Sequence, residues 1–563
     1  MSYGASKEEG EMVKRHGVTV ALVLVATLLL ALAVTGCGTS SSSTSGSASS
    51  GGTPKKGGTL VVTFQGEPTG LDPAIAWEVE SWSMEHMLYN TFLKYSSGAG
   101  DAGTKLVPDL ATAMPEVKNG GKTYIFHIRP DAKFAPPVNR PVTAEDFKYS
   151  FERMLKLPLA PATFFYSGVV GAQAYMDGKT KDVAGYKVID PHTVEIDLTA
   201  ANPAFLNAIS MPFCYVVPKE WVDKWGNKAF ARHPLGSGPF MFDHWTPGQE
   251  IVMKRNPNYF DQDHVYADEY DFHLSATPAT ALLQLERGEA DILGDGVPPA
   301  DFVRTMNDPK WKQYVDNAPQ IAFAYTFMNQ LEKPFDNVKV RQAICYAIDR
   351  TKIVKLLGGQ ASVIDQIYPV GMPGHQDGTN FYPYDPAKAK QLLAEAGYPN
   401  GFSTTYYADN VDPVPKIAQS IQNDLQAIGI KCSLKVMDRA TYWNFISLKK
   451  SHAAIGFSDW YQDFPDPSDW IGPLFIKSSA IDGGANSSFW WDPRVDQLYK
   501  QATTELDATK RLAMFQQMQD IIMQEAPVDP MYQPVFNAMF GPNVGGFYVH
   551  PVWTFNFVDY WKK

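Results

Sequence analysis

The sequence predicts a mixed α/β fold, and three observations support that prediction. After residue 58, segments in which apolar and polar residues alternate, as in strands, are interspersed with segments that begin with helix-capping residues. Residues 402–436 read in order as strand, helix and strand, the pattern of a βαβ unit. No internal repeat and no second low-complexity linker interrupts this order. We therefore expect α/β domains that pack together rather than separate modules joined by linkers.

Three segments have the composition expected of strands. They are 59–64 (TLVVTF), 122–129 (KTYIFHIR) and 192–198 (HTVEIDL). The second and third alternate apolar and polar residues, which is typical of a strand with one buried face.

Helix boundaries are marked by capping residues. Thr143 with Asp146 is a variant of the capping box, ahead of the apolar positions of a helix. Three Asp-Pro pairs each put a capping side chain before a Pro suited to the first helical turn: 385–386, 412–413 and 492–493. Gly397 and Gly429 stand where the following helices should end.

The N-terminus reads as an export signal. Lys14, Arg15 and His16 precede an apolar run over 18–34, and the run ends in Val-Thr-Gly-Cys37, which resembles a bacterial lipobox. We predict a lipoprotein signal peptide over 1–36, lipidation of Cys37, and a flexible Ser/Gly linker over 37–56. The alternative is a transmembrane helix, since about 17 apolar residues reach the lower limit for spanning a bilayer.

Composition limits the partners and the chemistry. The chain of 563 residues has a net charge of −11 and no basic run, so nucleic acid is not an expected partner. Apart from Cys37 its cysteines are Cys214, Cys345 and Cys432, widely spaced and odd in number, which predicts buried thiols rather than disulfides. The eleven histidines are scattered without metal-ligand spacing, so we predict no metal site and no cofactor.

Motifs of common enzymes are absent or isolated. The sequence contains no HExxH, no Walker glycine loop, no GxSxG and no paired CxxC. Ser447–Lys450 matches SxxK without its companion motifs. Asp463 and Asp466 could form the acid pair of a hydrolase, which stays open as a less favoured alternative to a protein that is not an enzyme.

Several segments in order resemble family 5 of the extracytoplasmic solute-binding proteins. They are GTLVVTF at 58–64, PTGLDP at 68–73, LVPDLA at 106–111, YIFHIRPDAKF at 124–134, VTAEDF at 142–147, GSGPF at 236–240, KRNPNY at 254–259, GEADI at 288–292, PFDNVKVRQA at 334–343, AIDR at 347–350 and KQLLAEAG at 390–397. The similarity runs from about residue 57 to the C-terminus. Each motif alone is modest, but their common order is specific.

The resemblance implies a class II-like periplasmic-binding-protein fold, with two α/β lobes around a ligand cleft and one extra domain. By analogy the first lobe is discontinuous, with 57–90, 235–320 and 536–563; the extra domain is 91–234 and the second lobe 321–535. The implied motion is hinge closure of the lobes around ligand.

The resemblance also implies a function. The chain is expected to be a membrane-anchored receptor that binds oligopeptides and delivers them to the permease and ATPase subunits of an ABC importer. Its place would be the extracytoplasmic face of a bacterial cell membrane, as a monomer held by its lipid anchor. The alternative within this fold is a non-peptide ligand: an oligosaccharide, a metal chelate or an opine.

The segment 458–467 (SDWYQDFPDP) carries the implied binding site. By residue match, Asp463 binds the peptide α-ammonium group and Trp460 lines the cleft, with Tyr461 as a third ligand-binding residue. Asp459 or Asp466 could replace Asp463. Trp490 and Trp491 are either further cleft residues or packing residues.

One position departs from the family's dipeptide receptors. Those receptors place an Arg before the helix that matches 415–419, to bind the ligand carboxylate. Here 407–414 reads YADNVDPV, with two acids and no Arg. Longer peptides are therefore expected, and Lys416, Lys431 or Arg439 remain as candidate replacements for the missing Arg.

Overall fold

The computed structural model describes residues 53–158 and 160–563, except for the side chain of Ala440. The predicted signal peptide (1–36), Cys37 and the linker up to residue 52 lie outside these described residues. Among the helices of the described part, none is both long and apolar enough to cross a bilayer.

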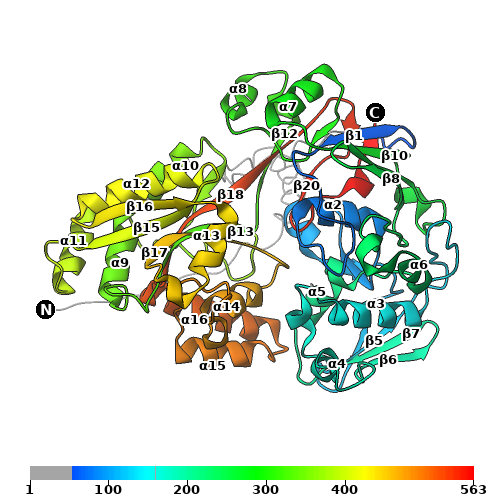
Figure 1. The fold of residues 1–563 in the computed structure, drawn as a ribbon, viewed down its shortest axis with the longest axis horizontal. Helices are drawn as coiled ribbons and strands as arrows, with labels where there is room; N and C mark the ends of the chain where they lie inside the picture. Colours follow the sequence, from blue (N-terminus) through cyan, green and yellow to red (C-terminus); the bar gives the residue numbers. More distant parts are fainter. Residues whose placement is uncertain (1–52, 159) are drawn as a thin grey trace, which may run out of the picture. The chain divides into compact units, whose positions relative to one another are not determined.

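The largest element of the fold is a mixed sheet of 12 strands (Figure 1). Its hydrogen-bonded order is β16-β15-β17-β13-β18-β11-β1-β10-β9-β8, and β12 and β14 also pair with β18. The bounds are β1 Thr59–Thr63, β8 Phe240–Thr246, β9 Glu250–Arg255, β10 Glu269–His273, β11 Ile292–Leu293, β12 Val315–Pro319, β13 Ala322–Met328, β14 Ala361–Val363, β15 Ser403–Asp409, β16 Lys431–Met437, β17 Ile455–Tyr461 and β18 Val528–Phe540. Every residue of β13 is buried, as expected for a strand covered on both faces.

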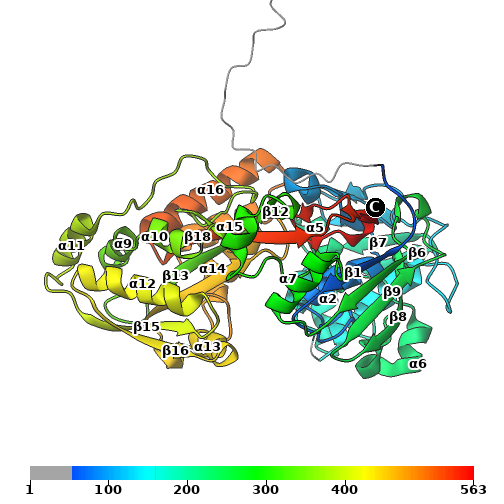
Figure 2. The same cartoon turned by 90° about the horizontal axis from the view of Figure 1, so that it is seen from above.

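Strand β18 lies in the middle of this sheet and joins its two parts (Figures 1 and 2). Its first residues pair with β13 around Val528–Tyr532, and its later residues pair with β12 and then with β11 at Met539 and Phe540. The two parts of the sheet therefore share one continuous strand.

Smaller sheets stand apart from the large one. β4 (Glu116–Lys118), β5 (Thr123–His127), β7 (Thr193–Asp197) and β6 (Tyr186–Asp190) form a four-stranded antiparallel sheet in that order. Two-stranded pairs are β2 (Leu93–Tyr95) with β3 (Leu106–Pro108), β19 (Val544–Gly545) with β22 (Trp561–Lys562), and β20 (Val549–His550) with β21 (Thr554–Phe555). The three predicted strands are confirmed as β1, β5 and β7.

The helices are α2 Val79–Leu88, α3 Ala144–Lys156, α4 Ala172–Met176, α5 Phe205–Ser210, α6 Lys219–Phe230, α7 Pro278–Arg287, α8 Phe302–Asn307, α9 Val338–Ala347, α10 Arg350–Leu356, α11 Pro386–Glu395, α12 Val414–Ala427, α13 Arg439–Ile446, α14 Ser468–Phe475, α15 Pro493–Ala502 and α16 Ala508–Glu525. The predicted βαβ unit is confirmed, because β15, α12 and β16 follow one another and the two strands pair in parallel. Gly397 and Gly429, both at positive φ, follow the ends of α11 and α12 as predicted.

Most of the predicted caps are present. The Asp146 carboxylate accepts hydrogen bonds from the Thr143 backbone N–H at 2.9 Å and hydroxyl at 3.0 Å, at the start of α3. Asp385 and Asp492 cap α11 and α15. The cap predicted at Asp412 is wrong, since its carboxylate pairs with Lys416 at 2.7 Å and the N-cap position of α12 is Pro413.

The hydrophobic side chains form several cores along the chain. One core draws on residues 321–532, a second on 74–235 with Phe464, and a third on 60–89, 215–274 and 538–560 with Ile292. A small cluster under α7 and α8 completes the set in the described residues. The exact lobe and extra-domain boundaries given above stay predictions.

The three thiols of the described chain are free and buried, as predicted. Burial raises the pKa of Cys214 to about 12 and that of Cys432 to about 11. Thiols that stay protonated at neutral pH are poor nucleophiles, so these cysteines act as small apolar residues.

Candidate functional site

A cavity of about 480 Å³ lies where β17 leaves the large sheet. Its walls come from segments that are far apart in the sequence. The lining includes Trp77, Glu78, Val79, Trp82, Pro319, Gln320, Phe536, Val549, His550, Pro551, Val552 and Thr554 on one side, and Ile321, Arg439, Trp443, Ser458–Asp463 and Ala485 on the other. The first group falls in the predicted first lobe and the second in the predicted second lobe. The cavity therefore has the position expected of an inter-lobe cleft.

The end of β17 positions the three predicted ligand-binding residues. Ala322, Phe323 and Ala324 of β13 pair with Tyr461, Trp460 and Asp459, so strand alternation sends Trp460 to the face opposite its two neighbours. Trp460, Tyr461 and Asp463 all line the cavity. Their role in binding a ligand stays a prediction.

Asp463 is the most buried carboxylate of the cavity wall, with 8% of its surface exposed. Its Oδ1 accepts a hydrogen bond from Trp77 Nε1 at 3.0 Å, across 386 residues of sequence. Its backbone N–H donates to Asp469 Oδ2 at 2.8 Å. Burial raises the pKa of both carboxyls, and the charge of Asp463 raises that of Asp469 further.

Asp459 is a second acid of the same wall. Burial raises its pKa to about 6; the charge of Arg439 opposes this rise, and the charge of Asp409 adds to it. In the described part of the chain, neither Asp459 nor Asp463 lies within 4 Å of a Lys, Arg or His nitrogen. Arg439 is the single Lys or Arg among the described residues that line the cavity, against Glu78, Asp459 and Asp463. The cavity is therefore suited to a cationic group.

Two uncharged polar groups of the wall also lack partners among residues 53–158 and 160–563. Trp460 Nε1 is buried and donates to no group in the described chain, and Gln462 Oε1 is buried and accepts from none. The amide nitrogen of Gln462 donates to the Pro551 carbonyl at 2.6 Å, which fixes the side chain. A buried donor and a buried acceptor without partners cost free energy unless a ligand or water satisfies them.

The structure distinguishes between the alternatives that the sequence left open for Asp466, Trp490 and Trp491. Asp466 does not line the cavity, and Arg511 binds both of its oxygens at 2.7 Å. Trp490 is 3% exposed and packs in the core beside Phe475. Of the two roles predicted for it, cleft residue or packing residue, the structure supports the second. Trp491 does not line the cavity. The centroid of its ring lies 4.5 Å from Lys477 Nζ.

Of the three cations that could replace the missing Arg, only Arg439 lines the cavity. Lys416 is occupied by Asp412, and Lys431 is exposed at the start of β16. Arg439 is the first residue of α13. It could replace the missing Arg because the fold brings it to the cavity, although it is not close to that position in the sequence.

A second cavity of about 450 Å³ shares Trp460 and Asp463 with the first. Its walls come from 164–208 of the predicted extra domain and from α14 and α15. Asp463 thus stands in the partition between the two spaces.

Some residues of the site were not found by sequence reasoning. Trp77, Asp469 and His550 carry no local motif, and only folding brings them to the segment 458–467. Burial lowers the pKa of His550 to about 4. The imidazole is therefore neutral at pH 7, in keeping with its Nδ1 accepting from the backbone N–H groups of Val552 and Trp553.

Comparison with known proteins identifies the family. Residues 105–481 match the model of the bacterial extracellular solute-binding proteins, family 5 Middle. The chain belongs to this family. Family 5 members are extracytoplasmic solute-binding transport proteins rather than enzymes, which supports a role without catalysis at that level.

Family 5 relatives align over nearly the whole chain. Di/tripeptide-binding protein 1 of Pseudomonas aeruginosa is 30% identical over 507 residues, covering 84% of this chain and 90% of that relative. Heme-binding protein A of Haemophilus influenzae is 29% identical, covering 88% and 90%. The periplasmic binding protein DppA of Helicobacter pylori, solved with the peptide STSA, is 26% identical with a TM-score of 0.76, covering 90% and 98%. The predicted periplasmic-binding-protein fold is confirmed.

Proposed function

We propose that this family 5 protein is the substrate-binding subunit of an ABC importer for oligopeptides, which it holds in the 480 Å³ cavity. Asp463 binds the α-ammonium group of the peptide, Trp460 and Tyr461 line the peptide's path, and the protein hands the peptide to a permease. Relatives named for di- and tripeptides, and a related structure that contains a peptide, support this choice of ligand.

The observation that carries the proposal is the buried Asp463 carboxylate without a cationic partner in the described chain. A buried carboxylate is costly unless it is paired, protonated or bound by a ligand. Among the described residues, its one side-chain donor from outside the acid pair is the neutral indole of Trp77. An ammonium group supplies a charge-assisted hydrogen bond that the protein leaves open.

The unpartnered polar groups fit the main chain of a peptide. A peptide carbonyl can accept from Trp460 Nε1, and a peptide N–H can donate to Gln462 Oε1. Main-chain recognition of this kind accepts many side chains. Arg439 is the candidate for the far carboxylate of the ligand.

Calorimetry with free and N-acetylated peptides tests this assignment. Acetylation should weaken binding by about 2–5 kcal/mol, the usual cost of removing one partner of a buried charge pair. Asp463→Asn should bind both forms with the same weak affinity, because the pair is already broken. Asp377→Asn is the matched control, since the Asp377 side chain is fully exposed and away from the cavity. Equal affinity of wild type for both peptide forms would refute the role of Asp463.

A non-peptide ligand is the second candidate. Trp77, Trp82, Trp443 and Trp460 on the cavity wall could stack on a planar or ring-shaped solute, and a relative is named for haem. Thermal shifts with peptides, haem and oligosaccharides compare the two candidates, since a ligand at 100 times its dissociation constant stabilises by about 2.7 kcal/mol.

We also propose that Cys37 carries the lipid that holds the protein at the membrane. The apolar run before Cys37 and the Ser/Gly segment after it support an anchored and tethered receptor. Cys37→Ser should move the protein from the membrane fraction to the soluble fraction. An unchanged membrane fraction would instead support the transmembrane alternative.

A further inference from the structure

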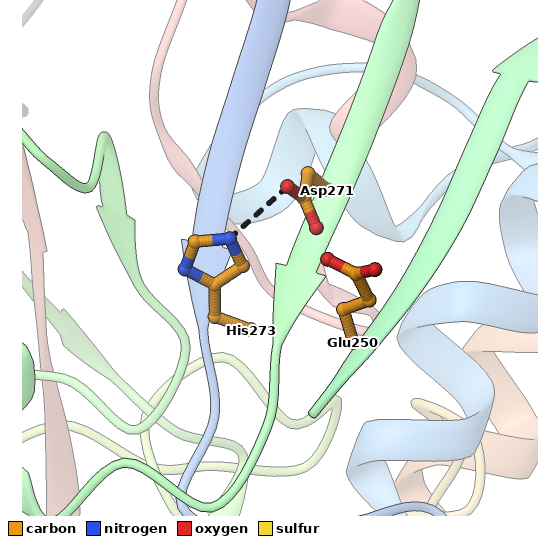
Figure 3. A group of neighbouring side chains, drawn as sticks. All are labelled: Glu250, Asp271 and His273. Carbon is orange, nitrogen blue, oxygen red and sulfur yellow. Dashed lines mark hydrogen bonds and ion pairs between the residues drawn. The ribbon is translucent and has the colours of Figure 1, made fainter. Parts of the chain in front are cut away.

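A compact group of donor side chains lies on β9 and β10, next to the edge strand β8 of the large sheet and away from both cavities. Glu250 of β9 and Asp271 and His273 of β10 bring one carboxylate oxygen each and one ring nitrogen within 4.8 Å of one another (Figure 3). The register explains the grouping, because Glu250 pairs with His273 and Asp271 lies two residues earlier on the same face of β10. The sequence does not indicate this group, because Glu250 and His273 are brought together only by the antiparallel pairing of β9 and β10.

The charges in this group are not balanced by a Lys or Arg. Asp271 Oδ2 accepts from His273 Nε2 at 3.0 Å, while Asp271 Oδ1 is buried and has no hydrogen-bond partner in the described chain. Figure 3 shows the Asp271 and Glu250 carboxylates facing each other. In residues 53–158 and 160–563, histidines are their only basic neighbours within 4 Å. Two facing carboxylates with an unused buried oxygen favour a bound cation between them.

A second histidine lies beside the group and contacts one of its members. His244 of β8 places its Nε2 3.2 Å from Glu250 Oε1. Its Nδ1 lies 2.8 Å from Asp243 Oδ2, so each ring nitrogen of His244 contacts a carboxylate. The group itself offers one imidazole and two carboxylates from two neighbouring strands, and His244 lies outside it, next to Glu250.

We propose that Glu250, Asp271 and His273 form a site for one divalent transition-metal ion of the Zn²⁺ type. Imidazole with carboxylate suits Zn²⁺ and its neighbours in the first row, whereas Ca²⁺ and Mg²⁺ take oxygen ligands. The 3.0 Å between His273 Nε2 and Asp271 Oδ2 is close to the edge of a tetrahedron with metal–ligand bonds of about 2.0–2.1 Å. The ion joins β9 and β10, next to the edge strand β8 of the large sheet.

The test is metal titration of the chelator-treated protein with Zn²⁺ by calorimetry, and with Co²⁺ by visible absorption. We expect one equivalent of either ion to bind, and Ca²⁺ and Mg²⁺ not to compete. His273→Ala should weaken Zn²⁺ binding by at least about 100-fold, because outer partners of metal ligands alone are worth about 10–100-fold. Glu250→Gln should also weaken it, and provides a second variant that preserves size.

The matched control is His127→Ala. His127 pairs with one carboxylate, Glu116, on the four-stranded sheet, and it is similarly half-exposed. This variant should keep the wild-type affinity. Wild-type protein that binds no Zn²⁺ at equimolar concentration, or His273→Ala and Glu250→Gln variants that bind like wild type, would overturn the site. Peptide binding does not enter this test, so its result is independent of the proposed function.

Discussion

Asp463 and Asp466 lie three residues apart, yet one belongs to the cavity wall and the other to the interior of the helical region. Asp466 is paired with Arg511 through two hydrogen bonds of 2.7 Å. Asp463 has an indole and a second carboxyl group as neighbours, and burial raises its pKa. One of these buried acids therefore has its charge balanced within the fold and the other does not, and we propose that a ligand balances the second.

The paired acid should be the more costly to disturb. Arg511→Met leaves the Asp466 charge buried without its partner, and such changes destabilise by about 3–5 kcal/mol. Chemical denaturation of the ligand-free protein measures this loss. A loss below about 1 kcal/mol would mean that the pair is not structural.

The unpaired acid should make ligand binding depend on pH. An ammonium ligand needs ionised Asp463, and a raised pKa means that the carboxyl takes up a proton as the pH falls from neutral. Affinity for a free peptide should therefore fall by up to about tenfold per pH unit on the acid side of this pKa. Calorimetry between pH 7 and pH 4 gives the profile, and Asp463→Asn should show a weaker pH dependence, with the remainder due to Asp459 on the same wall.

Removing the unpaired acid should stabilise the ligand-free protein. Because folding raises the pKa of Asp463, folding costs free energy whenever that carboxyl is ionised, and the cost disappears below the unfolded pKa of about 3.9. Asp463→Asn should add about 0.5–2 kcal/mol near pH 7, as other changes that relieve functional strain do, and nothing near pH 3. A destabilised Asp463→Asn protein at pH 7 would contradict the comparison with Asp466.

The smallest effect is expected at Trp77. Its hydrogen bond lowers the pKa of Asp463, so Trp77→Phe should raise that pKa and move the acid limb of the affinity profile upward by about half a pH unit or less. Trp82→Phe is the control, since Trp82 also lines the cavity but donates to the Ala76 carbonyl. Identical profiles for both variants would exclude a role of the indole in tuning Asp463.

The sequence predicted what depends on local pattern. Patterns of neighbouring residues were enough to predict three kinds of feature: strands β1, β5 and β7, the caps at Thr143, Asp385 and Asp492, and the unit β15–α12–β16. The cap at Asp412 failed because a nearby lysine competes for its carboxylate. The family resemblance pointed to Trp460, Tyr461 and Asp463, which do line one cavity.

Contacts between distant segments could not be predicted in this way. Nothing near Trp77 indicates that it contacts Asp463, and nothing near Asp466 indicates Arg511. The same is true of Glu250, Asp271 and His273, whose grouping depends on the register of two strands. Register and tertiary pairing decide whether a polar side chain is satisfied, and only the folded chain contains that information.

The path of β18 has a consequence for how the molecule is made. The core around β1 draws on residues 60–89 and on 538–560, so its first and last parts are separated by nearly the whole polypeptide. A chain emerging from its N-terminal end cannot finish this half until its final residues arrive through β18. A chain that stops before residue 538 therefore leaves the apolar side chains of residues 60–89 without part of their core.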